Sequence, residues 1–165
     1  MKTDTRISSF PPIVDEVSRI LILGSVPGVR SLEMQQYYAH PQNRFWKILF
    51  EIFEEEFTCD YESRTRLLKR NHIALWDVID SCERKGSLDS DIRNEEANGI
   101  AELLENYSAI KAIFCNGQKS HKNLMSILGK EFPIPVFVLP STSPANAGIS
   151  YADKLQAWKK ITQYL

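Results

Sequence analysis

The sequence predicts an α/β fold, a three-layer α/β/α sandwich around a central, mostly parallel four-stranded sheet. Four short runs are nearly continuous in Ile, Leu, Val and Phe, which suits strands covered on both faces. Amphipathic helical patterns separate these runs, and regular alternation of strands and helices favours parallel strands joined by right-handed crossovers.

The strands are expected in "RILILGS" from Arg19, "IALWDVI" from Ile73, "AIKAIFCNG" from Ala109 and "IPVFVLP" from Ile134. Helical patterns occupy residues 43–57, 61–71, 94–107, 118–129 and 151–165. Asn94 is expected to cap the third of these helices, and Gly129 to end the fourth.

Composition predicts one soluble domain over residues 1–165, and leaves open whether residues 1–17 form a loose N-terminal extension. No segment approaches the roughly 18 apolar residues of a membrane span, so we expect a cytoplasmic protein without membrane contact. We also expect a monomer. Three widely spaced cysteines, Cys59, Cys82 and Cys115, suggest no metal site, and we expect neither metal nor cofactor. The net charge is only -1, so any attraction to DNA must be local.

Ligands of such sheets bind at the carboxyl ends of the strands. The segments that follow those ends are "GSVPGVRSL", "DSCERKGSLDSD", "NGQKSH" and "PSTSPANAG". In the first of them, Gly24 and Gly28 remove side chains and Pro27 fixes the loop, which lets a backbone approach a ligand closely. A plain strand-to-helix turn is the alternative, and neither a dinucleotide nor a triphosphate fingerprint is present.

The stretch "YYAHPQNRFW", residues 37–46, crowds aromatic rings and polar side chains directly after that loop. Together with "GSVPG", "LWDVIDSCERKGSLDS", "FCNGQKS" and "PSTSPAN", it resembles the uracil-DNA glycosylase superfamily. The resemblance is greatest to the hypoxanthine-DNA glycosylase family and spans about residues 18 to 165. It implies a uracil-DNA glycosylase-like fold and an enzyme that extrudes a damaged base from DNA.

The resemblance implies that Tyr38 stacks on the extruded base and that Asn116 reads its edge, beside Gly24, Ser25 and Val26. An ordinary half-buried tyrosine and a turn asparagine are the alternatives. An amide offers a donor and an acceptor, which match the N1–H and O6 of hypoxanthine. Uracil presents a similar pair, so the edge alone does not choose the base.

The catalytic residues implied by the resemblance are Asn43 and Ser141. Asn43 matches the residue that orients the attacking water, and because an amide takes no proton, the glycosidic bond must be largely broken first. Helix capping is the alternative for Asn43, and the two roles are compatible. Val26 stands where many members of the superfamily carry Asp or Asn. Ser141 stands where a histidine of the superfamily often sits. Without that histidine, a backbone N–H or the Ser141 hydroxyl is left to stabilise the departing base.

Contacts to the DNA backbone are expected from the loops around this site. In the loop "CERKGSLDSD", Ser87 or Asp89 is expected to contact DNA or a neighbouring loop, with helix capping by Ser90 or Asp91 as the alternative. The predicted DNA-binding residues are Pro27, Gly28, Arg44, Lys119, Ser143, Pro144, Ala145 and Asn146.

The predicted function is monofunctional hydrolysis of the N-glycosidic bond of a deaminated base in DNA, with hypoxanthine as the expected base. Two alternatives remain open. The first keeps the fold and changes the base to uracil or mismatched uracil or thymine. The second is a DNA-damage binder with little catalysis, because no Asp or Asn stands at position 26.

Overall fold

The architecture was obtained as a computed structural model that describes residues 6–129 and 132–165. Its central sheet is formed by β2 (Ile20–Gly24), β3 (Ile73–Asp77), β6 (Ala112–Asn116) and β7 (Val136–Leu139). The strand order is β3-β2-β6-β7, and all neighbours are parallel. The predicted α/β fold with a four-stranded parallel sheet is therefore confirmed.

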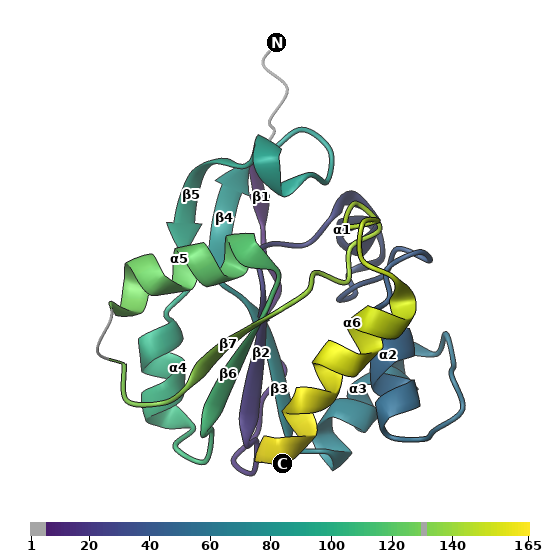
Figure 1. Cartoon of the computed structure of the whole chain (residues 1–165). Helices are drawn as coiled ribbons and strands as arrows, with labels where there is room; N and C mark the ends of the chain where they lie inside the picture. The colour runs from purple at the N-terminus through teal and green to yellow at the C-terminus, as the bar shows by residue number, and fades with distance from the viewer. Residues whose placement is uncertain (1–5, 130–131) are drawn as a thin grey trace.

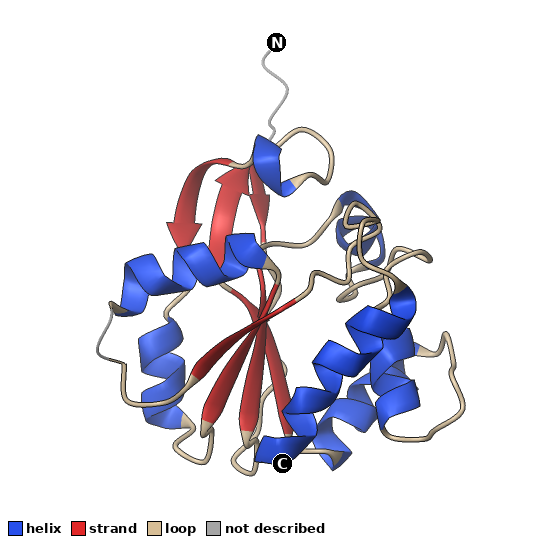
Figure 2. Ribbon diagram, viewed as in Figure 1, coloured by secondary structure: helices blue, strands red, loops and turns tan. Residues whose placement is uncertain are grey.

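Helices cover both faces of this sheet, as Figures 1 and 2 show. One face packs against α2 (Phe45–Ile52), α3 (Tyr61–Arg70) and α6 (Tyr151–Trp158), and the other against α4 (Ile100–Asn106) and α5 (Gln118–Leu128). The short helices are α1 (Val29–Met34), η1 (Asp89–Asp91) and η2 (Lys159–Tyr164).

The two faces have separate cores because successive residues of a strand point to opposite sides of the sheet. In β2, Ile20 and Ile22 pack in the core that contains Trp46, while Leu21 and Leu23 pack in the other. All four side chains of the strand are 0% exposed, which explains why the sequence of β2 is continuously apolar.

Local capping fixes several helix ends. The Asp60 side chain accepts a hydrogen bond from the Ser63 N–H at the start of α3, and Ser150 caps α6 in the same way. Gly129 follows α5 with a φ of 75°, a left-handed conformation that glycine adopts without strain. The predicted end of this helix is confirmed.

A second, antiparallel sheet corrects two of the predictions. It consists of β1 (Arg6–Ser8), β4 (Ile79–Glu83) and β5 (Arg93–Ala97) in the order β1-β4-β5. The predicted strand "IALWDVI" is in fact two strands, since β3 ends at Asp77 and β4 enters the other sheet. The predicted cap at Asn94 is also wrong: Asn94 lies in β5, and α4 begins only after Gly99.

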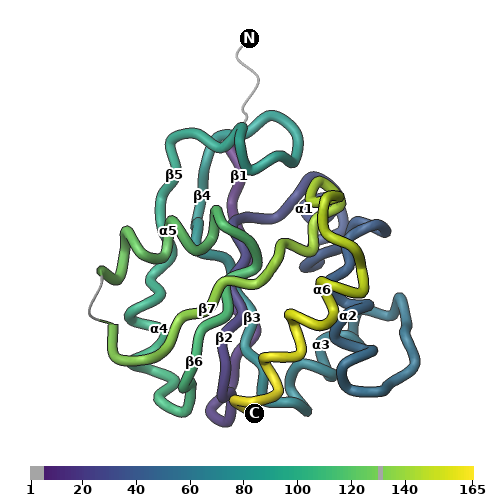
Figure 3. Tube along the Cα trace, viewed as in Figure 1, coloured from purple at the N-terminus to yellow at the C-terminus, as the bar shows by residue number. Residues whose placement is uncertain are grey.

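The N-terminal segment that the sequence left open, residues 1–17, is partly held in place. Arg6–Ser8 pairs with β4, and Ile13 forms a bridge with Leu75 of β3. Figure 3 follows this trace from β1 to the central sheet. Residues 1–5 lie outside the described residues. None of the helices within residues 6–129 and 132–165 is long and apolar enough to cross a membrane.

Candidate active site

A cavity of about 800 Å³ lies at the carboxyl ends of the central strands. The last residue of each strand lines it, in the order Asp77, Gly24, Asn116 and Leu139 across the sheet. Gly24 and Asp77 are direct neighbours in the register of β2 and β3. This is the edge of the sheet at which the sequence analysis expected a ligand.

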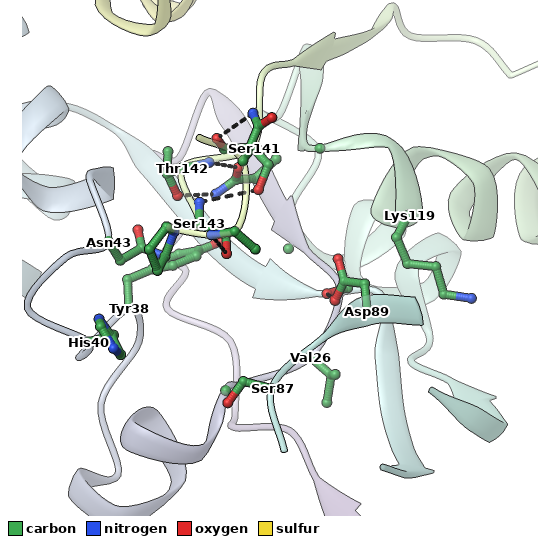
Figure 4. Close-up of a pocket in the computed structure, with 18 of the residues that line it drawn as sticks. Val26, Tyr38, His40, Asn43, Ser87, Asp89, Lys119, Ser141, Thr142 and Ser143 are labelled. Atoms are coloured by element: carbon green, nitrogen blue, oxygen red, sulfur yellow. Dashed lines mark hydrogen bonds between the residues drawn. The ribbon is translucent and has the colours of Figure 1, made fainter. Parts of the chain in front are cut away.

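The structure brings the predicted site residues together at this cavity, with the exception of Arg44. Figure 4 shows side chains from separate segments of the chain around one central space. The predicted residues that line it are Gly24, Ser25, Val26, Pro27, Gly28, Tyr38, Asn43, Asn116, Lys119, Ser141, Ser143, Pro144, Ala145 and Asn146.

Tyr38 forms one wall of the cavity. Its ring is half-buried and stacks on Phe45, with the ring centroids 4.1 Å apart, and its backbone has a left-handed φ of 52°. Burial, and then the nearby Asp77 carboxyl, raise the pKa of its hydroxyl far above the ordinary value, while the Asn116 amide opposes the rise. The hydroxyl therefore stays neutral.

Asn43 lies at the start of α2 and also lines the cavity. Its Oδ1 accepts a hydrogen bond of 3.0 Å from the N–H of Phe45, the first residue of the helix. Its Nδ2 makes no hydrogen bond to any residue that the structure describes. The N-cap residue of α2 is Arg44, which makes no side-chain cap, so the N-cap predicted at Asn43 lies one residue too early. The bond from Phe45 still satisfies one N–H of the first turn and leaves part of the Asn43 amide available to the cavity.

Thr142 connects three segments of the site, and the sequence analysis missed it. It exchanges two hydrogen bonds with the Asn116 side chain, and its carbonyl accepts a hydrogen bond from the Arg44 N–H. Ser141 belongs to the same loop, where its Oγ accepts from the Ser143 N–H at 3.2 Å. The side chain of Thr142 is fully buried, so this loop is anchored from within.

The loop after β2 is held by the segment that follows β4. The Ser25 hydroxyl donates to Asp89 at 2.8 Å, and the Val29 N–H donates to the Ser87 hydroxyl at 2.9 Å. Of the two alternatives for this segment, contact with a neighbouring loop is the one observed. Capping of the next helix by Ser90 or Asp91 is not, because α4 begins after Gly99 without a side-chain cap.

The Val26 side chain has a packing role. Its side chain is 9% exposed and belongs to a small apolar cluster with Ile79, Cys82 and Ile92. The nearby Arg84 guanidinium is buried and donates to the Pro27 carbonyl at 2.6 Å, which fixes the backbone of the same loop. The loop is therefore preorganised by its neighbours.

Asp77 is the main site residue that the sequence analysis did not single out. It is 3% exposed, lines the cavity, and has a buried Oδ2 without a hydrogen-bond partner among the described residues. Burial raises the pKa of its carboxyl to about 7, Asp89 adds to the rise, and Arg84 opposes it. An acidic residue inside the apolar run "IALWDVI" was the signal that could have identified it.

Arg44 faces a second, smaller hollow of about 360 Å³ beside the main cavity, which Tyr151 and Lys154 also line. The guanidinium of Arg44 lies 5.6 Å from the centroid of the Tyr151 ring. Lys154 is only 4% exposed and has no acidic partner among the ion pairs of the described residues. Lys119, by contrast, is paired with Glu95 at 3.2 Å.

The fold and the cavity are those of an α/β/α domain whose candidate ligand site lies at the carboxyl end of a parallel sheet. The sequence profile of the uracil DNA glycosylase superfamily matches residues 11–163. The chain belongs to this superfamily, and the family identified from its motifs is confirmed.

Two curated relatives carry the name hypoxanthine DNA glycosylase. The protein of Methanosarcina barkeri is 41% identical over 140 residues, which cover 83% of this chain and 86% of the relative. The protein of Methanosarcina acetivorans is 37% identical over 158 residues, covering 94% and 97%. A solution structure from the same species, described as a candidate uracil DNA glycosylase, has a TM-score of 0.78 at 35% identity and covers 94% of this chain and 96% of that chain.

Proposed function

We propose that this chain is a DNA glycosylase that hydrolyses the N-glycosidic bond of hypoxanthine in DNA. Two relatives of that name, similar over most of both chains, support the substrate. The observation that carries the proposal is the convergence of Tyr38, Asn43 and the ends of the parallel strands on one cavity of about 800 Å³. That volume is typical of small-ligand pockets and accommodates an extruded base.

In the proposed reaction, the base leaves the helical stack and its plane stacks on the ring of Tyr38. The bond between the sugar C1′ and the base nitrogen breaks, with its electron pair going to the base. Asn43 orients a water molecule whose oxygen bonds to C1′, and the water gives up a proton as the departing base gains one. An amide suffices because the sugar is already strongly electrophilic when water attacks.

Two further parts of the proposal concern the departing base and the DNA backbone. Ser141 and the N–H groups of its loop stabilise the negative charge that develops on the base. The phosphates are contacted by loop backbone and by the basic side chains near the two hollows. The DNA-binding residues of the proposal are Pro27, Gly28, Arg44, Lys119, Ser143, Pro144, Ala145 and Asn146. We also propose that the protein is a cytoplasmic monomer and that it works without metal or cofactor.

A second candidate substrate is uracil. It is favoured by the similar solution structure, whose name refers to uracil, and by the shared edge of the two bases, an N–H donor beside a carbonyl acceptor. A pocket that accepts the larger purine does not exclude the pyrimidine by size alone. The remaining alternative is a protein that binds damaged DNA with little catalysis.

A panel of duplexes carrying one deoxyinosine, deoxyuridine, deoxyxanthosine or mismatched thymidine tests these options. After incubation, alkali cleaves the strand wherever a base has been removed. We expect the highest single-turnover rate on deoxyinosine. Faster release of uracil would support the second candidate, and retained binding without release of any base would support the non-catalytic alternative.

A further inference from the structure

Large apolar side chains are exposed around the opening of the main cavity. Four of the residues that line it keep more than a third of their surface in water, and they are Val29, Leu88, Val138 and Ile149. Leu88 is the most exposed of the four, at 51%. Single exposed apolar residues are common on protein surfaces, but several around one opening indicate a partner that covers apolar surface there.

Leu88 lies in the loop between β4 and η1, and the residues on both sides of it are anchored. The Ser87 hydroxyl accepts a hydrogen bond from the Val29 N–H at 2.9 Å, and the Asp89 carboxyl accepts one from the Ser25 hydroxyl at 2.8 Å. Figure 4 shows Ser87 and Asp89 at the cavity, apart from the labelled residues of the loop after β7. The backbone that carries Leu88 is therefore fixed on two sides.

The exposure of Leu88 contrasts with that of Ile92, the next apolar residue of the same segment. Ile92 is 4% exposed and packs with Val26 and Cys82. Leu88 stays outside this cluster, so it gains little of the stabilisation that burial gives an apolar side chain. Its apolar surface remains available to a ligand of the cavity.

The other three side chains of the rim are less suited to meet the bases of DNA. Val138 belongs to β7 and is held within the central sheet. Val29 is the first residue of α1 and carries a shorter, β-branched side chain. Ile149 also lines the smaller hollow with Arg44 and Lys154, whose positive charges suit the phosphate backbone.

Removing a base from the helical stack leaves a gap, and proteins that distort DNA often insert apolar side chains between base steps. We propose that Leu88 inserts into the base stack beside the extruded nucleotide and fills the gap that the base leaves. Pro144 and Ala145, exposed in the loop after β7, present smaller apolar surfaces. The inference rests on the proposed function, because it requires an extruded base in the cavity.

The first test compares single-turnover excision of deoxyinosine from a duplex and from a single strand of the same sequence. The single strand has no paired stack for the base to return to, so it does not need the inserted side chain. Leu88→Ala should be about 10- to 100-fold slower than the unsubstituted chain on the duplex and match it on the single strand. Leu88→Met, which keeps an apolar side chain of similar size, should lose far less. Ile127→Ala is the matched control, because Ile127 is exposed on α5 and lines neither hollow.

A pyrene nucleotide opposite deoxyinosine gives a second measurement, which needs only the duplex. The flat pyrene ring fills the gap from the other strand and so replaces the missing side chain. Leu88→Ala should then regain most of its lost rate. Asn43→Ala should not, because it lacks the group that orients water and keeps the one that fills the gap.

Three results would overturn the inference and leave the proposed function standing. They are an unchanged duplex rate in Leu88→Ala, an equal loss on duplex and single strand, and a loss that pyrene does not reduce. If the unsubstituted chain releases no base from any duplex of the lesion panel, both the inference and the proposed function fail.

Discussion

The side chain of Asn116 and the residue Thr142 hold each other by two reciprocal hydrogen bonds. The Thr142 N–H donates to Asn116 Oδ1 at 3.0 Å, and Asn116 Nδ2 donates to the Thr142 hydroxyl at 2.9 Å. The contact joins the end of β6 to the loop that follows β7. It therefore fixes both the amide in the cavity and the loop that carries Ser141.

Thr142→Val should loosen this connection. Valine keeps the shape of the side chain but leaves Asn116 Nδ2 without its acceptor, at a cost of about 1–3 kcal/mol in the free energy of unfolding. We expect lower stability in urea denaturation and slower base excision. Thr142→Ser retains the hydroxyl and is the matched control; equal losses in both variants would show that packing, and not the hydrogen bond, matters at this position.

Gly24→Ala should abolish most activity. The added methyl group would meet Asp77 Oδ1 at 2.5 Å and Tyr38 Oη at 2.6 Å, closer than atoms can pack, so two cavity side chains must move. Single-turnover excision is the measurement. Gly148→Ala is the control, because a Cβ atom there meets nothing within 4 Å. Wild-type activity in Gly24→Ala would mean that the cavity is wider than the structure indicates.

The sequence was sufficient to predict the central sheet, because its buried strands are apolar without interruption and its helices have clear apolar faces. It was insufficient for the second sheet. The five residues of β5 are all exposed and include Glu95 and Glu96, so they carry no apolar alternation that would distinguish a strand from a helix. Strand pairing with β4 overrides this weak local preference.

The site was predictable to the extent that its residues lie in recognisable motifs. Tyr38, Asn43 and the loop from Ser141 to Asn146 all reach the cavity. Asp77 was not predicted as a site residue, because its significance depends on its burial and on the close approach of Tyr38 and Asp77 to Gly24. Both are properties of the folded chain. The acidic residue inside the apolar run "IALWDVI" marks the position as unusual, but its burial and its neighbours are visible only in the folded chain.

Substitutions of Asn43 should separate its capping role from its role with water. Asn43→Ala removes the acceptor for the Phe45 N–H and should cost about 1 kcal/mol of stability as well as most of the turnover. Asn43→Ser keeps a capping oxygen but is too short to reach into the cavity. We expect Asn43→Ser to be nearly as stable as the unsubstituted chain and as inactive as the alanine variant, with DNA affinity retained in both. Turnover in either variant at the unsubstituted rate would remove Asn43 from the reaction.

Asp77 should make the stability of the protein depend on pH. The pKa of its carboxyl is about 7 in the folded state, above the ordinary value of about 3.9 in the unfolded chain. The folded state therefore keeps a proton that the unfolded state releases, so the stabilisation is complete below about pH 4 and is lost as the pH rises to about 7.

Asp77→Asn removes this dependence and should raise the free energy of unfolding at pH 8. Each unit of pKa shift corresponds to about 1.4 kcal/mol, so the gain is on the order of a few kcal/mol. Urea denaturation at pH 5 and pH 8 measures it. Asp80→Asn is the control, because Asp80 is exposed and its removal should change little. A variant that is no more stable than the unsubstituted chain at pH 8 would contradict the raised pKa.

The smaller hollow beside the cavity should bind a DNA phosphate. Arg44 and Lys47 both lie over the ring of Tyr151, at 5.6 and 4.9 Å from its centroid, and Lys154 lines the same hollow with most of its side chain buried. Burial, and then the nearby Arg44, lower the pKa of Lys154, which forms no ion pair with any acidic residue that the structure describes. An anion placed between them would relieve their repulsion.

Lys154→Ala should therefore weaken DNA binding and reduce its salt dependence. Neutralising one phosphate contributes about 0.9 to the slope of the logarithm of affinity against the logarithm of salt concentration, so the variant should lose about one unit of slope on duplexes with or without a lesion. Fluorescence anisotropy across a salt series measures both quantities. Lys160→Ala is the matched control, because Lys160 is exposed and lies over the Phe137 ring, outside both hollows. If the two variants have the same slope, the hollow takes no part in holding the DNA backbone.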